Sequence, residues 1–217
     1  MKKALALTAA LGLLSLSTTA HAQFFGQMGP LGPTSEHGIE MVGAYVGLAT
    51  DEIGATGHLR FGIDSEKWDV GVQGGFVKVS NGGPTGEGAQ VDLKGALGML
   101  GESKEVKWGG DISAGVSHFG GDFSATSISI AAIPGISIQH PMSGGASVSG
   151  WGGFGIAWTH TSVSGGGSGS SSSGELRLGG GYGFSKDMTV VAEFNHGFAN
   201  GGGNEFLAGI NFGLGGK

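Results

Sequence analysis

The ten residues Ala55-Thr-Gly-His-Leu-Arg-Phe-Gly-Ile-Asp64 decide the class of fold. One set of alternate positions is apolar or small, and it holds Ala55, Gly57, Leu59, Phe61 and Ile63. The other set is mostly polar, and it holds Thr56, His58, Arg60, Gly62 and Asp64. Successive side chains of a β-strand point to opposite faces, so this alternation predicts a strand with one apolar and one polar face.

The same period of two recurs along most of the chain. It is found in segments 68–76, 91–99, 106–116, 128–138, 148–158, 176–184, 190–194 and 206–214, and segment 40–48 is a weaker first candidate. Together with 55–64, these segments predict ten strands, with eight as the alternative number. The chain also contains 49 Gly among 217 residues. Because each Gly costs about 1 kcal/mol in a helix relative to Ala, a helical fold is disfavoured.

The first 22 residues have the pattern of a cleavable secretory signal peptide. Lys2 and Lys3 precede an apolar run from Ala4 to Leu16, and Ala20-His21-Ala22 supplies the small residues of a cleavage site after Ala22. The apolar run is shorter than the roughly 20 residues of a membrane-spanning helix. We therefore expect three regions: signal peptide 1–22, an irregular segment 23–37, and a β-rich domain 38–217.

The connections between the predicted strands fall into two alternating sets. One set is short, at 65–67, 101–105, 141–145 and 185–187, and the other is generally longer and more polar, at 50–53, 81–87, 120–125, 162–174 and 200–204. The serine- and glycine-rich part of 162–174, residues 165–174, is expected to be a flexible exposed loop. Short turns at one rim and longer loops at the other are typical of transmembrane β-barrels.

Aromatic residues gather near the predicted strand ends, on the apolar phase. Trp68, Trp108, Tyr182 and Phe184 fall near the short connections, whereas Trp158, Phe198 and Phe206 fall near the long ones. Two such belts mark the two water interfaces of a membrane barrel. Aromatic residues also favour strand ends in soluble β proteins, so this observation leaves that alternative open.

With its N-terminal signal, lack of cysteine, alternating strands and two belts, the chain resembles the small porin-like β-barrel proteins of the Gram-negative outer membrane. The resemblance covers 38–214 and implies an all-β, up-and-down antiparallel transmembrane barrel in the cell outer membrane. It implies outer-membrane lipid and the barrel-assembly machinery as partners. The implied function is a structural role or a narrow passive channel for small solutes.

In such a barrel the polar phase faces the lumen. The expected lumen polar network contains charges of both signs: His58, Arg60, Asp69, Asp92, Lys94, Lys107, Asp111, Arg177 and Glu193. The amides of Gln73, Asn195 and Asn211 lie on the same phase. Opposite charges in a narrow interior are expected to pair, since isolated buried charges are costly. Many other lumen positions are Gly or Ser, which leaves a water-filled interior as an alternative.

No catalytic, metal or cofactor site is expected. The histidines lie on separate predicted strands without metal-ligand spacing. The segment from His196 to Glu205 faintly resembles the His-x-Ser region of outer-membrane lipid A deacylases, but position 198 is Phe, so the nucleophile is missing. The 17 acidic against 11 basic residues, without a basic cluster, disfavour nucleic acid. Two further alternatives are a soluble exported β-rich binding protein and, less favoured, a lipid-modifying enzyme.

Overall fold

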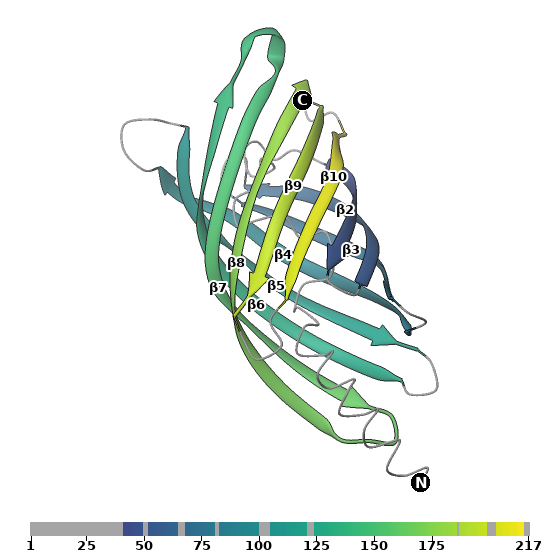
Figure 1. The fold of residues 1–217 in the computed structure, drawn as a ribbon. Helices are drawn as coiled ribbons and strands as arrows, with labels where there is room; N and C mark the ends of the chain where they lie inside the picture. The colour runs from purple at the N-terminus through teal and green to yellow at the C-terminus, as the bar shows by residue number, and fades with distance from the viewer. Residues whose placement is uncertain are drawn as a thin grey trace.

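Ten antiparallel strands pair in chain order, and the first strand closes the sheet by pairing with the last (Figure 1). The computed structural model describes residues 41–49, 52–64, 68–80, 83–99, 105–120, 124–185, 187–198 and 203–214. The strands are β1 Met41–Ala49, β2 Glu52–Asp64, β3 Trp68–Val79, β4 Thr85–Met99, β5 Val106–Phe119, β6 Ala125–Pro141, β7 Ser147–Val163, β8 Ser168–Ser185, β9 Met188–Gly197 and β10 Asn204–Gly213. A single 3-10 turn, η1 (Ser143–Gly145), joins β6 to β7.

Closure is visible in the pairing registers of β1. Met41 lies opposite Arg60 of β2 on one side and opposite Gly213 of β10 on the other. A sheet closed in this way has no long unpaired edge around its middle. We call the end where β1 begins and β10 ends the terminal rim, and the opposite end the distal rim.

The prediction of ten strands in an up-and-down antiparallel barrel is confirmed. All the segments read as strands from the sequence are strands, and most of them are longer than the apolar pattern indicated. The predicted regions 1–22 and 23–37 lie outside the described residues.

The predicted alternation of short and long connections is wrong. Residues 50–51 join β1 to β2 at the distal rim, whereas the longer stretch 100–105 joins β4 to β5 at the terminal rim. The expected flexible loop is also wrong for 168–174, because β8 begins at Ser168 and pairs with β7 along this stretch. The hydrogen bonds between paired strands are made by backbone groups, so a sequence of serine and glycine can form a strand without any apolar alternation.

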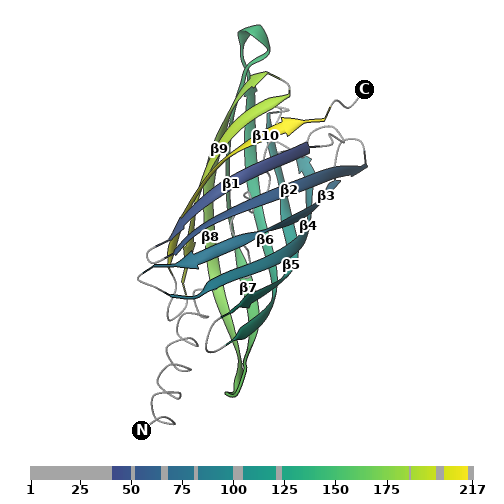
Figure 2. The ribbon, with the colours of Figure 1, turned by 90° about the vertical axis from the view of Figure 1, so that its right-hand side faces the viewer.

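The barrel wall is taller on one side than on the other. β6, β7 and β8 have 17, 17 and 18 residues, whereas β1, β9 and β10 have 9, 10 and 10. The β6–β7 hairpin therefore extends beyond its neighbours at the terminal rim, and the β7–β8 hairpin extends at the distal rim (Figures 1 and 2).

Burial follows the period of two and is inverted relative to a water-soluble protein. Large apolar side chains cover the outside, with exposed fractions of 58% for Ile112, 53% for Val72 and 57% for Phe154. Polar and charged side chains face inward and are buried, among them Arg60, Asp92 and Lys94. Among the described residues, no helix is long and apolar enough to cross a membrane.

Candidate functional site

The lumen holds an ion cluster centred on Arg60 of β2. The Arg60 Nε–H donates to Asp69 Oδ1 of β3 at 2.8 Å, and Nη1 lies 2.7 Å from Asp92 Oδ2 of β4. The guanidinium reaches Asp92 by crossing over Gly71 of β3, where an added Cβ would lie 2.6 Å from Asp92 Oδ1. A fork of donors with fixed geometry is well suited to hold two carboxylates.

Two further cations complete the cluster. Lys94 and Arg177 both have an exposed side-chain fraction of 0%, so neither head group is in contact with bulk water. Lys94 interacts electrostatically with Asp69, Asp92 and Asp111. Arg177 Nη2 lies 3.3 Å from Glu175 Oε2 on the same strand. Buried charges of this kind are tolerated only when opposite charges and hydrogen bonds compensate them.

Two large aromatic side chains are buried inside the barrel. Tyr45 of β1 and Trp151 of β7 pack together with Val191 of β9, although β1 and β7 lie on different sides of the ring of strands. The Tyr45 hydroxyl donates to Asn211 Oδ1 at 2.7 Å, and the Trp151 Nε1–H donates to Glu193 Oε2 at 2.6 Å. Through these contacts and Val191, the two buried aromatic side chains are held against β9 and β10 inside the barrel.

Glycine makes room for both aromatic rings. A Cβ added at Gly209 would collide with the Tyr45 ring, and one added at Gly179 would collide with the Trp151 indole. The large side chain on one strand therefore lies over a glycine on the next. Part of the unusual glycine content is thus a packing requirement of the closed lumen.

The lumen wall formed by β6 and β7 is different, since it carries no charged residue on its inward phase. Apart from Ile133, Trp151 and Val163, its buried side chains are small or hydroxylated, and Ala131 packs on Ala157. The hydroxyls of Ser127 and Thr161 lie 2.8 Å apart in a hydrogen bond. We call this the neutral wall, and we call β2 to β5 the charged wall.

The structure places most of the expected lumen residues together. The buried ones are His58, Arg60, Asp69, Asp92, Lys94, Asp111, Arg177 and Glu193. Lys107 is the exception, because it lies half-buried at the start of β5, near the terminal rim. It lies on the same phase as Asp111, four residues nearer the terminal rim.

Among the buried lumen residues that were missed from the sequence are Tyr45, Trp151, Glu175 and Glu205. Trp151 and Glu175 lie on the inward phase of their strands, so position alone could have identified them. Tyr45 lies on the weakest predicted strand. Glu205 accepts a hydrogen bond at 3.3 Å from Asn195 Nδ2, and it lies between the predicted connection 200–204 and the predicted strand 206–214.

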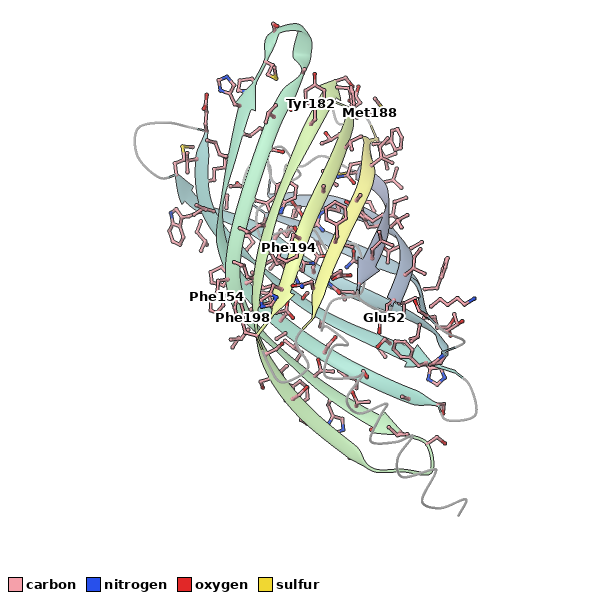
Figure 3. All side chains as sticks on the ribbon, in the orientation of Figure 1. Glu52, Phe154, Tyr182, Met188, Phe194 and Phe198 are labelled. Atoms are coloured by element: carbon pink, nitrogen blue, oxygen red, sulfur yellow. The ribbon has the colours of Figure 1, made fainter. Side chains whose placement is uncertain are left out.

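The expected interface aromatics all lie on the outer face. Figure 3 shows Tyr182 near the terminal rim and Phe198 nearer the distal rim. The exposed fractions are 42% for Trp108, 40% for Trp158, 41% for Tyr182, 52% for Phe184 and 48% for Phe206. Trp68 is half-buried because its indole covers Gly95 of β4.

Nothing among the described residues has the geometry of a metal site, that is, three or more His, Cys, Asp or Glu side chains gathered together. His196 Nδ1 lies 2.7 Å from Asn204 Oδ1, within hydrogen-bond distance. Phe198 packs edge-on against this imidazole. The position of the missing nucleophile is therefore occupied by an aromatic contact.

Comparisons with known proteins give matches of fold only. No protein-family model matches the sequence, and no curated protein does. The N-terminal β-barrel domain of Pseudomonas aeruginosa OprF is 10% identical, covers 82% of this chain and 98% of its own, and has a TM-score of 0.38. The β domain of the Bordetella autotransporter Brka is 12% identical, with 82% and 100% covered and a TM-score of 0.42. The outer membrane protease OmpT from Escherichia coli is 9% identical, with 82% and 94% covered and a TM-score of 0.38. The chain is thus similar to these barrels in strand arrangement, and its own pairing registers define it as a closed ten-stranded β-barrel.

Proposed function

We propose that the protein is an outer-membrane β-barrel with a closed lumen, and that it acts as a structural component of the membrane rather than as an open channel. The burial of the charged side chains in the lumen supports the proposal that the lumen is closed. Lys94 and Arg177 have exposed fractions of 0%. In a water-filled pore the head groups of inward-facing cations would be accessible to water.

The outer face supports the membrane location. Exposed leucine, isoleucine, valine and phenylalanine side chains surround the barrel, and an apolar surface of this extent is unstable in water. Aromatic residues lie toward both rims, as they do where a barrel crosses the two interfaces of a bilayer. In this orientation the terminal rim faces the periplasm and the distal rim faces outward. The lipid and the barrel-assembly machinery are then the partners.

Membrane insertion is tested by fractionation of cells that express the full chain. We expect the protein in the outer-membrane fraction, with faster gel migration before heating than after it. N-terminal sequencing of the recovered protein should give Gln23 as the first residue, since cleavage is proposed after Ala22. Recovery of the protein entirely from the soluble periplasmic fraction would favour the alternative of a soluble exported β-rich binding protein.

Closure is tested by planar-bilayer conductance of the refolded protein. We expect no steady conductance from the natural chain, and a double variant, Asp92→Asn with Asp111→Asn, tests whether loss of two lumen carboxylates opens a path. Steady ion flow through the natural protein would instead favour the second candidate, a narrow passive channel for small solutes. Bilayers that receive only detergent serve as the control.

Enzymatic activity is not proposed. A catalytic role for the distal rim would require a nucleophile with a base and an orienting group. Among the described residues, His196 lies against Asn204 and Phe198, and neither of these supplies a nucleophile. Incubation of the inserted protein with radiolabelled lipids should leave the lipids unchanged, and release of labelled fatty acid would overturn this part of the proposal.

A further inference from the structure

A basic side chain with an oxygen partner recurs on the outer face near the distal rim. His118 Nδ1 lies 3.0 Å from Thr126 Oγ1, and His160 Nδ1 lies 2.9 Å from Ser170 Oγ. His196 Nδ1 lies 2.7 Å from Asn204 Oδ1. Each pair joins directly opposite residues of one distal hairpin: β5–β6, β7–β8 or β9–β10.

The β3–β4 hairpin has a related arrangement. Lys78 lies opposite Thr85, is exposed, and sits between the buried residues Val77 and Val79, so it is on the outer face. Four of the five distal hairpins therefore carry a basic, outward-facing residue near the end of the strand that runs toward the distal rim. We call Lys78, His118, His160 and His196 the distal basic girdle.

Aromatic rings flank two members of this girdle. The Trp158 indole stacks on His160 with ring centroids 6.1 Å apart, and Phe198 packs edge-on to His196 at 4.6 Å. Exposed aromatic rings of a barrel lie at the level of the lipid headgroups. If the barrel is inserted as proposed above, His160 and His196 lie beside such rings.

The terminal rim offers a direct contrast. There, His140 Nδ1 lies 3.1 Å from Glu105 Oε1, so a positive charge on this imidazole is compensated within the protein. The partners of the distal histidines are a threonine hydroxyl, a serine hydroxyl and an asparagine carbonyl, which are neutral. Imidazole gains a proton readily near neutral pH, and a charge held by neutral oxygens calls for an external anion. Glu87 is the carboxylate opposite His118 on β4, so His160 and His196 are the less compensated members.

From these contacts we infer that the distal basic girdle binds the anionic phosphate of lipid headgroups in the leaflet that surrounds the distal rim. The neutral oxygen partner fixes Nδ1 of each imidazole and thereby the ring, which leaves Nε2 to meet the phosphate. Lys78 contributes a permanent charge to the same level. The inference rests on the membrane location proposed above and adds the class of lipid that the barrel selects.

Native mass spectrometry of the refolded full chain tests the inference. The protein is released from mixed micelles that contain equal amounts of phosphatidylglycerol and phosphatidylcholine with matched acyl chains. We expect preferential retention of phosphatidylglycerol by the natural protein. A triple variant, His118→Gln, His160→Gln and His196→Gln, should lose at least about fivefold of this preference, as expected for one lost basic group or more at a lipid surface. His140→Gln is the matched control and should keep it.

Gel mobility before heating is read on every sample, so that failure to insert is separated from failure to select lipid. Failure of the natural chain to insert would overturn the proposed function. Correct insertion with equal retention of both lipids, or an equal loss in His140→Gln, would overturn the lipid inference alone. Abolition of the preference by inorganic phosphate in the micelles would assign the girdle to free phosphate and would also overturn it.

Discussion

The charged wall and the neutral wall fill the lumen with different kinds of side chain. On β2 to β5, Arg60 holds two carboxylates, and the buried Lys94 is compensated by acidic neighbours. On β6 and β7, buried alanine, serine and threonine side chains fill the space without any charge. The difference teaches that the charged wall depends on attraction between opposite charges, whereas the neutral wall depends on close backbone approach.

The largest effect is expected where the charged wall loses its central cation. Arg60→Met should lower the free energy of unfolding by about 3 to 5 kcal/mol, because Asp69 and Asp92 remain buried without their partner. Urea unfolding of the refolded barrel in micelles measures this change. Thr161→Val on the neutral wall is the matched control, with a loss of about 1 kcal/mol. Equal losses in the two variants would remove the distinction between the walls.

The contact of the neutral wall with Glu193 of β9 comes next. Trp151→Phe should cost about 1 to 3 kcal/mol, since the buried Glu193 carboxylate loses the indole N–H that donates to it at 2.6 Å. The same unfolding assay measures the effect. Trp108→Phe on the exposed outer belt retains most of its apolar contact and should cost less than about 1 kcal/mol. A larger loss at Trp108 than at Trp151 would contradict the assignment of Trp151 to the lumen closure.

Close backbone approach in the neutral wall is tested by one added methyl group. A Cβ at Gly155 would meet the Ala132 carbonyl oxygen and lie 2.7 Å from Ile133 Cα, so Gly155→Ala should cost about 1 to 3 kcal/mol. At Gly57 the nearest atom is the Gly43 carbonyl oxygen at 3.8 Å. Gly57→Ala should therefore change stability by less than about 0.5 kcal/mol. Thermal unfolding followed by circular dichroism compares the two variants.

The smallest effect is expected for the hydroxyl pair of the neutral wall. A double-mutant cycle with Ser127→Ala and Thr161→Val should give a coupling energy of about 0.5 to 1 kcal/mol, typical of a neutral hydrogen bond. A coupling of several kcal/mol would mean that this wall, too, depends on strong polar pairing.

Much of this fold follows from the sequence because the period of two survives in nearly every strand. The alternation predicts both the number of strands and the inward position of Arg60, Asp92 and Lys94. The ends of the strands could not be predicted, since Ser168 to Ser173 pair through the backbone and have no apolar signal. The clustering of Tyr45 and Trp151 in the lumen could not be predicted from the sequence either. The cluster of Tyr45, Trp151 and Val191 joins residues that are distant in sequence, and only the completed ring of strands brings them together.

Reactivity of a lumen cysteine tests the closed lumen most directly, since the natural chain has none. Ser113 lies on β5 with an exposed fraction of 2%, and Ser164 is exposed in the turn between β7 and β8. The single variants Ser113→Cys and Ser164→Cys are treated in membranes with a charged, water-soluble thiol reagent. With a closed lumen, Ser113→Cys should react at least about a hundredfold more slowly, because reaction must wait for a rare opening. Similar rates at the two positions would show a water-filled lumen and contradict the account.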